Sequence, residues 1–248
     1  MAGTAVLGRL TWLVAEVTET VTETPRVRTL ILDVDGWPGH RAGQHVDVRL
    51  TAEDGYQAER SYSLASAPEE PPALTVERLD DGEVSPYLVD EVVPGDRFEL
   101  RGPVGGYFVW DAGSSLDALL LVAGGSGVVP LMAMLRHRAA AGSKVPAKLL
   151  YSSRTFEDVI YRDELDRLGG RGDGLEVVHT LTRAQPPGWA GHAGRVDVEL
   201  LRQVAFPPER NPRVFVCGPT SFVEAVADQL VGLGHRPGRI RTERFGGT

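Results

Sequence analysis

The chain has 248 residues, of which 42% are hydrophobic, and it carries a formal net charge of −8. This charge argues against a general nucleic-acid binder, because that role needs a basic surface to meet phosphate. The single cysteine, Cys217, excludes an intrachain disulfide and cannot supply the set of thiolates that an iron–sulfur cluster takes. Any such cluster would have to belong to a partner.

The six histidines show no metal-ligating spacing, so we expect no structural metal. No apolar run approaches the roughly 20 residues that a membrane-spanning helix needs. The first residues also lack a basic flank followed by an apolar segment. We therefore expect no membrane insertion and a cytoplasmic location.

The first part of the chain, from residue 8 to about 110, breaks into short runs rich in β-branched and aromatic residues. Glycine, proline and aspartate separate the runs, which predicts an antiparallel barrel or sandwich. One short helix is expected over Tyr87–Val92, with Ser85 as its N-cap and Pro86 in its first turn. The expected strands are Leu10–Val17, Arg26–Val34, His45–Leu50, Ser61–Ala65, Ala73–Leu79, Arg97–Leu100 and Tyr107–Trp110.

After residue 112 the pattern changes to apolar runs that alternate with helical segments. This alternation predicts five strands in a parallel sheet, with ligands at their carboxyl ends. We expect two domains, at residues 1–112 and 113–248. The expected strands are Ala118–Val122, Lys148–Tyr151, Leu175–Leu181, Val214–Cys217 and Arg239–Arg244; the helices are Val128–Ala141, Glu157–Leu168, Val198–Val204 and Ser221–Val231.

Arg60-Ser61-Tyr62-Ser63 places a cation, an aromatic ring and two hydroxyl groups at consecutive positions of one predicted strand. Because side chains alternate along a strand, Arg60 and Tyr62 should share one face. Arginine can pair with a pyrophosphate, tyrosine can lie against an apolar ring and serine can donate to a ring nitrogen. The set therefore suits a flavin nucleotide, although a half-buried strand with one surface arginine explains the tetrapeptide equally well.

Two glycine-containing turns can bind phosphate. Gly124-Gly125-Ser126-Gly127 joins an apolar strand to a helix, where glycines allow close approach of the backbone and the first N–H groups attract anions. A plain strand–helix turn is the alternative, since the Gly-x-Gly-x-x-Gly fingerprint is absent. The stretch Asp81–Pro86 would offer helix-start donors to a second phosphate group, or serve as an ordinary turn.

Arg154, Arg183 and Arg195 follow or lie near the carboxyl ends of the second and third strands of the parallel sheet. Together they can clamp a phosphate monoester, whereas an unphosphorylated ribose usually meets an acidic residue after the second strand. Solvated surface arginines are the alternative. Cys217 ends the fourth strand, at the expected ligand crevice, and would otherwise be an inert buried cysteine.

The motifs occur in one order along nearly the whole chain. They are Arg60-Ser61-Tyr62-Ser63, Gly82–Ser85, Gly102-Pro103-x-Gly105, Gly124–Gly127 with Pro130, Cys217-Gly218-Pro219 and Glu243-Arg244-Phe245. In that order they resemble the ferredoxin–NADP reductase superfamily. The resemblance implies an antiparallel Greek-key β-barrel that binds flavin, followed by an α/β domain with five parallel strands that binds the nicotinamide nucleotide.

The same resemblance assigns roles to individual residues. Arg60 pairs with the flavin pyrophosphate, Tyr62 packs against the isoalloxazine and Ser63 hydrogen-bonds near N5. A phosphate site at Ser85 implies FAD, with FMN left open. The basic set at Arg154, Arg183 and Arg195 resembles the one that holds the 2′-phosphate of NADPH, with NADH left open. The full set of expected cofactor contacts is Arg60, Ser61, Tyr62, Ser63, Val76, Arg78, Gly82, Val84, Ser85, Gly124, Gly125, Ser126, Gly127, Ser153, Arg154, Thr182, Arg183, Arg195, Cys217, Gly218, Pro219 and Phe245.

Four residues are expected to take part in catalysis by this resemblance. Ser63 and Cys217 would lie beside the reacting rings, and Phe245 would stack on the flavin and gate the nicotinamide. Glu243 would relay protons or contact the acceptor, or else be a surface glutamate. Gly246-Gly247-Thr248 extend past the aromatic residue at which similar chains end, so the position of this tail is left open.

The implied activity is transfer of a hydride from NADPH to FAD, followed by single-electron transfer to a separate ferredoxin or flavodoxin, with an oxygenase as one destination. Such acceptors are usually acidic, so docking would use a local basic patch, for which Arg236, Arg239, Arg241 and Arg244 are candidates. Two alternatives stay open: a reductase of free flavin, quinone or another small oxidant, and a flavin-binding electron-transfer or regulatory subunit without its own turnover. We expect a monomer.

Overall fold

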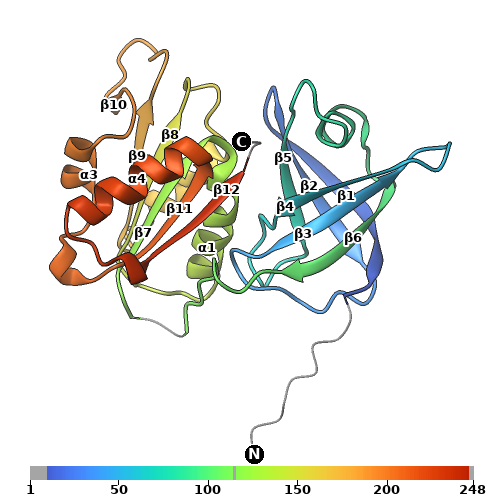
Figure 1. The fold of residues 1–248 in the computed structure, drawn as a ribbon, viewed down its shortest axis with the longest axis horizontal. Helices are drawn as coiled ribbons and strands as arrows, with labels where there is room; N and C mark the ends of the chain where they lie inside the picture. Colours follow the sequence, from blue (N-terminus) through green and yellow to red (C-terminus); the bar gives the residue numbers. More distant parts are fainter. Residues whose placement is uncertain (1–9, 114–115, 246–248) are drawn as a thin grey trace, which may run out of the picture.

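The computed structural model describes residues 10–113 and 116–245, and these residues form two six-stranded sheets that lie side by side (Figure 1). The first sheet is antiparallel in the order β4-β3-β6-β1-β2-β5. A bridge between Leu64 and Leu74 joins the ends of its two outer strands, so the sheet curls into a barrel and the predicted antiparallel architecture is confirmed. Its strands are β1 (Trp12–Thr24), β2 (Val27–Val34), β3 (His45–Thr51), β4 (Gln57–Ser63), β5 (Ala73–Glu77) and β6 (Arg97–Val104).

The second sheet is parallel, with the order β10-β9-β8-β7-β11-β12, as predicted. Its strands are β7 (Leu119–Gly124), β8 (Ala147–Ser153), β9 (Leu175–Leu181), β10 (His192–Ala193), β11 (Arg213–Pro219) and β12 (Ile240–Phe245). The two-residue strand β10 adds a sixth strand to the five expected, because its pairing with β9 is too short to leave a hydrophobic pattern.

Four α-helices cover the parallel sheet, with α1 (Val128–Ala140) and α2 (Arg162–Gly169) on one face and α3 (Val198–Val204) and α4 (Thr220–Gly232) on the other. The face that carries α1 turns toward the barrel (Figure 1). Barrel residues such as Ala65 and Ala73 share a hydrophobic cluster with α1, so an apolar interface joins the two halves. No helix among the described residues combines the length and apolarity needed to cross a bilayer.

β6 continues to Val104 instead of ending at Leu100, and two other barrel strands are also substantially longer than predicted. β1 continues to Thr24 because Thr18–Thr24 pairs with β2 as a ribbon, where β-branched threonine fits a strand without an apolar face. β4 begins at Gln57 and pairs with β3 along its whole length at the exposed end of the sheet order. In both segments most residues are polar, so the alternation of apolar and polar residues on which the strand prediction depended is absent.

The predicted strand Tyr107–Trp110 is wrong, since these residues make no ladder in the structure. They form the connection between the sheets; Phe108 and Trp110 are buried in the hydrophobic cluster of the α/β half, whereas Tyr107 is 62% exposed. Phe108 contacts Phe215 edge to face with the ring centroids 5.2 Å apart. The apolar run therefore reflects burial between two sheets instead of membership in one.

Two helix predictions also need correction. Tyr87–Glu91 forms a π-helical turn after Pro86, and the Oγ of Ser85 accepts a hydrogen bond from the N–H of Leu79 instead of capping that turn. Helix α2 begins at Arg162, five residues later than predicted. Tyr161 before it has a φ of 58°, a left-handed conformation that a helix cannot include, so the helix cannot extend back toward Glu157.

Candidate cofactor site

A cleft of about 970 Å³ separates the barrel from the carboxyl ends of the parallel strands. Its barrel wall consists of the end of β4, the β1–β2 turn, part of β5 and the turn at residues 82–85. Its other wall consists of the turn after β7, the ends of β8 and β11, the loops after β9 and β10, and the start of α4. A ligand held there would touch both halves of the chain at once.

On the barrel wall, the residues Arg60-Ser61-Tyr62-Ser63 close β4 and all line the cleft. Arg60 and Tyr62 lie opposite the buried residues Val48 and Val46 of β3, so they share the inner face as predicted. Ser61 lies on the other face, where its hydroxyl donates to Asp47 at 2.6 Å. Its side chain therefore supports the sheet, and any cofactor contact of Ser61 would come from the backbone.

Arg60 holds its guanidinium over the cleft through Glu83. Its Nη2 donates to Glu83 Oε2 at 2.7 Å, and the Tyr56 hydroxyl donates to Glu83 Oε1 at 3.0 Å. Both members of the ion pair are about half exposed, so the pair is screened by solvent and adds little to stability. A phosphate group could replace the carboxylate as partner of Arg60 at small cost.

Tyr62 is packed against the barrel core, and burial raises the pKa of its hydroxyl to about 12. It is therefore a neutral aromatic surface at physiological pH. The turn Gly82–Ser85 lies beside it on the cleft wall, and a β-carbon at Gly82 would come within 2.8 Å of Ser85 Oγ. Glycine thus lets the turn fold tightly around the serine hydroxyl.

On the α/β wall, the glycine turn is shaped by two different constraints. Gly125 has a φ of +56°, which an L-residue rarely adopts, whereas Gly127 has an ordinary φ but no room for a side chain. A β-carbon at Gly127 would lie 2.2 Å from the carbonyl oxygen of Cys217. The turn therefore packs directly on the end of β11, and Gly124, Gly125 and Ser126 face the cleft.

Cys217 lines the cleft, and Glu243 lies beside it in register on the neighbouring strand, with Cys217 on β11 and Glu243 on β12. Burial raises the pKa of the Cys217 thiol, with Glu243 adding to the effect, so the group is a neutral thiol at physiological pH. Burial also raises the pKa of Glu243 to about 7. The Glu243 carboxyl lies 3.8 Å from Nδ1 of His45. Burial lowers the pKa of His45, so its ring is neutral at neutral pH and the contact is not a charged pair.

Three exposed arginines stand at the outer end of the α/β wall, each just after a parallel strand. Arg154 follows β8, Arg183 follows β9 and Arg195 follows β10, and the backbone N–H of Arg183 donates to the carbonyl of Arg154 at 2.8 Å. Within the described residues, no acidic side chain pairs with any of these three guanidinium groups. They are therefore free to meet an anionic ligand.

Most of the predicted site residues are brought together by the fold; four of the expected cofactor contacts and the expected catalytic residue Glu243 lie off the cleft. The residues that line it, within the described part of the chain, do not include Val76, Arg78, Gly127, Gly218 or Glu243. Val76 lies in the barrel core and Arg78 pairs with Asp90 at 2.7 Å, so their side chains are already engaged. Gly127 and Gly218 act by close packing, and Glu243 is the neighbour of Cys217 on β12. Phe245 does line the cleft; Gly246-Gly247-Thr248 lie outside the described residues.

Several residues of the cleft were not singled out from the sequence. Glu83 is inside the predicted phosphate turn but was not weighed as the partner of Arg60. Thr75 and Ile160 face the cleft from β5 and from the loop before α2, and no motif marks either of them. Phe222 contacts both Gly124 and Gly218, which only the packing of α4 against the turn could reveal.

The donor set fits a flavin and a dinucleotide. The barrel wall offers a cation, an aromatic surface and hydroxyl groups, and the α/β wall offers a glycine turn at a helix start followed by three unpaired cations. The cleft volume of about 970 Å³ is at the upper end of the range typical of small-molecule and cofactor sites.

Comparison with known proteins agrees with this geometry. The oxidoreductase FAD-binding domain family matches residues 15–109, and the oxidoreductase NAD-binding domain family matches residues 121–228. The ferredoxin–NADP reductase B of Sorangium cellulosum is 37% identical over 211 residues, which cover 82% of this chain and 84% of that protein. The chain belongs to the ferredoxin–NADP reductase superfamily. It thus carries an oxidoreductase FAD-binding domain followed by an oxidoreductase NAD-binding domain.

Other similar proteins are named as a monooxygenase reductase subunit and a cytochrome P450 reductase. The glycine betaine monooxygenase reductase subunit of Pseudomonas aeruginosa is 32% identical over 212 residues, which cover 84% of this reductase and 57% of that protein. The reductase therefore spans little more than half the length of that relative. The crystal structure of the Amycolatopsis cytochrome P450 reductase GcoB aligns with a TM-score of 0.82 and 27% identity, covering 98% of this chain and 73% of that one.

Proposed function

We propose that this reductase oxidises NADPH and passes the electrons through FAD to a separate one-electron protein acceptor, a ferredoxin or flavodoxin that serves an oxygenase. Residues 1–112 are the FAD-binding domain, residues 113–248 the NADP-binding domain, and the chain acts as a monomer. The relatives named as reductase components of monooxygenases support the oxygenase destination.

The observation that carries the choice of NADPH is the row of Arg154, Arg183 and Arg195 after three neighbouring parallel strands. Their position at the carboxyl ends of β8, β9 and β10 is where an adenosine ribose lies in doubly wound folds. Arginine's rigid fork suits a phosphate monoester, and these three side chains have no acidic partner in the described structure. A 2′-phosphate would satisfy them.

FAD, when bound, would supply the capacity to take up a hydride and to release single electrons. The protein supplies position: Arg60 and the Gly82–Ser85 turn hold the flavin phosphates, and Tyr62 supports the ring. Gly124 and Gly125 admit the nucleotide pyrophosphate. Cys217 stays a neutral thiol, so it provides a surface beside the reacting carbon without adding charge.

The acceptor would dock on exposed cations near the carboxyl end of the chain. Arg236 and Arg244 are exposed and available for this role. Arg239 is instead bound to Asp117 at 2.6 Å, and Arg241 donates to the carbonyl of Val109 at 2.9 Å. Arg236 and Arg244 are therefore the better candidates among the four basic residues for contact with an acidic acceptor.

Arg154→Gln tests the nucleotide assignment. Loss of one charged contact to the 2′-phosphate should raise the KM for NADPH by about tenfold to a hundredfold, because such a hydrogen bond contributes about 1.5–3 kcal/mol. The KM for NADH should change by less than about twofold, since NADH has no 2′-phosphate. Arg202→Gln on α3, whose partner is Glu199, is the control. Equal increases in the KM for NADPH and for NADH would show that Arg154 does not contact the 2′-phosphate.

A further inference from the structure

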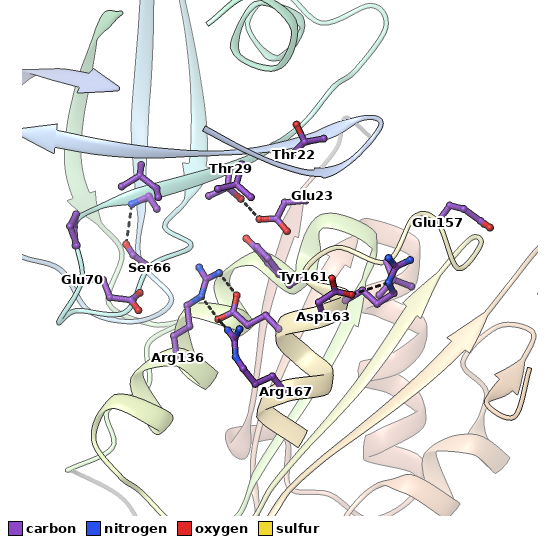
Figure 2. Close-up of a pocket in the computed structure, with 17 residues that line it drawn as sticks. Thr22, Glu23, Thr29, Ser66, Glu70, Arg136, Glu157, Tyr161, Asp163 and Arg167 are labelled. Carbon is purple, nitrogen blue, oxygen red and sulfur yellow. Dashed lines mark hydrogen bonds and ion pairs between the residues drawn. The ribbon is translucent and has the colours of Figure 1, made fainter. Parts of the chain in front are cut away.

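A second cavity, of about 580 Å³, lies between the barrel and the α/β half (Figure 2). The β1–β2 hairpin and the loop before β5 line it from the barrel, and α1 and the segment Glu157–Arg167 line it from the other half. Its polar groups are joined by contacts that cross from one half of the chain to the other. Two of these cross-links are built from side chains that the cofactor chemistry leaves unused.

The first link is made by Arg136 of α1. Its Nη1 donates to the carbonyl of Ala65 in the barrel at 2.8 Å, while its Nε and Nη2 donate to the Glu164 carboxylate of α2 at 3.0 and 2.6 Å. The side chain is only 15% exposed, and its guanidinium lies 4.9 Å from the centre of the Tyr161 ring. One planar group therefore fixes two helices to the loop that follows β4.

The second link is a directed chain of hydroxyl groups. The Tyr161 hydroxyl donates to Thr75 Oγ1, and Thr29 Oγ1 donates to the Glu23 carboxylate at 2.7 Å. Since each hydroxyl has one proton, Thr75 must donate to Thr29, whose Oγ1 lies 2.7 Å away. The chain thus runs from the α/β half to β1 in a single direction, ending on a carboxylate.

Tyr161 adopts an unfavourable backbone conformation at this place. It is buried and has a φ of 58°, a conformation that is unfavourable for a residue with a β-carbon. Two contacts hold Tyr161 in that conformation: its hydroxyl donates to Thr75, and its ring lies against the Arg136 guanidinium. Strain of this kind persists where the surrounding structure fixes it, which marks Tyr161 as a constrained point between the two halves.

Both links attach to parts of the chain that also line the cofactor cleft. Thr75 and Ile160, the neighbour of Tyr161, face that cleft, and Ala65 follows Ser63 by two residues. Arg136 is nine residues beyond Gly127, which places it about 14 Å along the helix from the nucleotide turn. A tilt of about 5° at Arg136 would therefore move that turn by about 1 Å, enough to slow a hydride transfer by about a hundredfold.

We propose that Arg136 and Tyr161 are positioning residues for hydride transfer, which lock the angle between the nucleotide-binding half and the barrel. The proposal rests on the proposed function for its effect on rate, and on the contacts at the second cavity for its effect on geometry. The two effects can be measured separately.

The geometric test uses a pair of spin labels on the flavoprotein. Gln57→Cys on β4 and Asp228→Cys on α4 are exposed attachment points, and the native Cys217 is buried and should not react. Pulsed EPR should give one narrow distance distribution in the parent protein. Arg136→Lys and Tyr161→Phe, introduced separately, should broaden it, because lysine cannot make the forked contact and phenylalanine ends the hydroxyl chain. An unchanged width in both variants would overturn the proposal.

The kinetic test uses anaerobic stopped-flow reduction at increasing NADPH. Each variant should lower the limiting rate at least tenfold and weaken the long-wavelength charge-transfer absorbance, with the half-saturating NADPH concentration changed by less than about twofold. Arg97→Lys, whose partner Glu16 lies in the same barrel, is the control and should match the parent. A lower melting temperature with an unaltered limiting rate and charge-transfer band would show that both residues only stabilise the fold. Failure of the parent to be reduced would refute the proposed function, while the spin-label distances would still decide the geometry.

Discussion

Replacing Glu243 with glutamine should remove a large pH-dependent part of the free energy of unfolding. Burial raises the pKa of this carboxyl from its ordinary 4.5 to about 7. Its Oε2 is buried and finds no hydrogen-bond partner among the described residues. The folded protein therefore holds a proton on Glu243 over a pH range in which the unfolded chain has lost it.

The sign and size of the effect follow from that difference. Because the folded-state pKa lies above the unfolded one, the stability that protonated Glu243 contributes is present below about pH 4.5 and is lost as the pH rises through about 7. The full difference corresponds to about 3 kcal/mol, of which about 2.5 kcal/mol falls between pH 5 and pH 8. Glutamine stays neutral, so its stability should lack this decline.

Urea unfolding of the flavoprotein at pH 5 and pH 8 measures the effect. The free energy of unfolding of Glu243→Gln relative to the parent should rise by about 2.5 kcal/mol from pH 5 to pH 8. Glu224→Gln on the exposed side of α4 is the control and should show a change below about 0.5 kcal/mol. Parallel pH profiles for Glu243→Gln and the parent would refute the view that burial holds the proton on this carboxyl.

Three further outcomes follow from the cleft. Gly127→Ala should lower the free energy of unfolding by about 1–3 kcal/mol in urea melts, because its methyl group would press on the Cys217 carbonyl; an unchanged midpoint would contradict this packing. Arg60→Gln should weaken FAD binding at least tenfold in a fluorescence titration, whereas Glu83→Gln, which frees Arg60, should not; equal losses would show that the ion pair itself is needed. The buried Cys217 thiol should react with iodoacetamide at pH 8 at least about a hundredfold more slowly than free cysteine, and comparable rates would exclude the neutral, shielded thiol.

The sequence was most informative where local pattern and tertiary structure agree. The strand preceding Gly124 is wholly buried, so a continuous apolar run marked it, and the glycine turn followed directly. The same holds for the alternation in β3, where Val46 and Val48 face inward. In such segments one physical constraint, burial of a face or a backbone turn, decides both sequence and structure.

It was least informative where the deciding contact is remote. The apolar run Tyr107–Trp110 looked like a strand because burial between two sheets requires the same residues as burial within one. The left-handed Tyr161 shortened α2, and it is held by remote contacts: its hydroxyl donates to Thr75, 86 residues away, and its ring lies against the Arg136 guanidinium. Local pattern carries no information on such a partner.

The candidate site shows the same division. Motif order located the cleft, yet the pairing of Arg60 with Glu83 and the position of Glu243 beside Cys217 required coordinates. The three arginines after β8, β9 and β10 were expected at the ends of two strands, and the short β10 supplied a third. A two-residue strand defined by pairing with β9 leaves no pattern of its own.

Anaerobic mixing of the purified flavoprotein with NADPH and with NADH, followed at the oxidised-flavin absorbance band, tests the central claim most directly. The account predicts rapid bleaching by NADPH at concentrations where NADH acts far more slowly, and return of the yellow colour when a ferredoxin or flavodoxin is added. No bleaching with either nucleotide would contradict the reductase activity, and faster bleaching by NADH would contradict the role given to Arg154, Arg183 and Arg195.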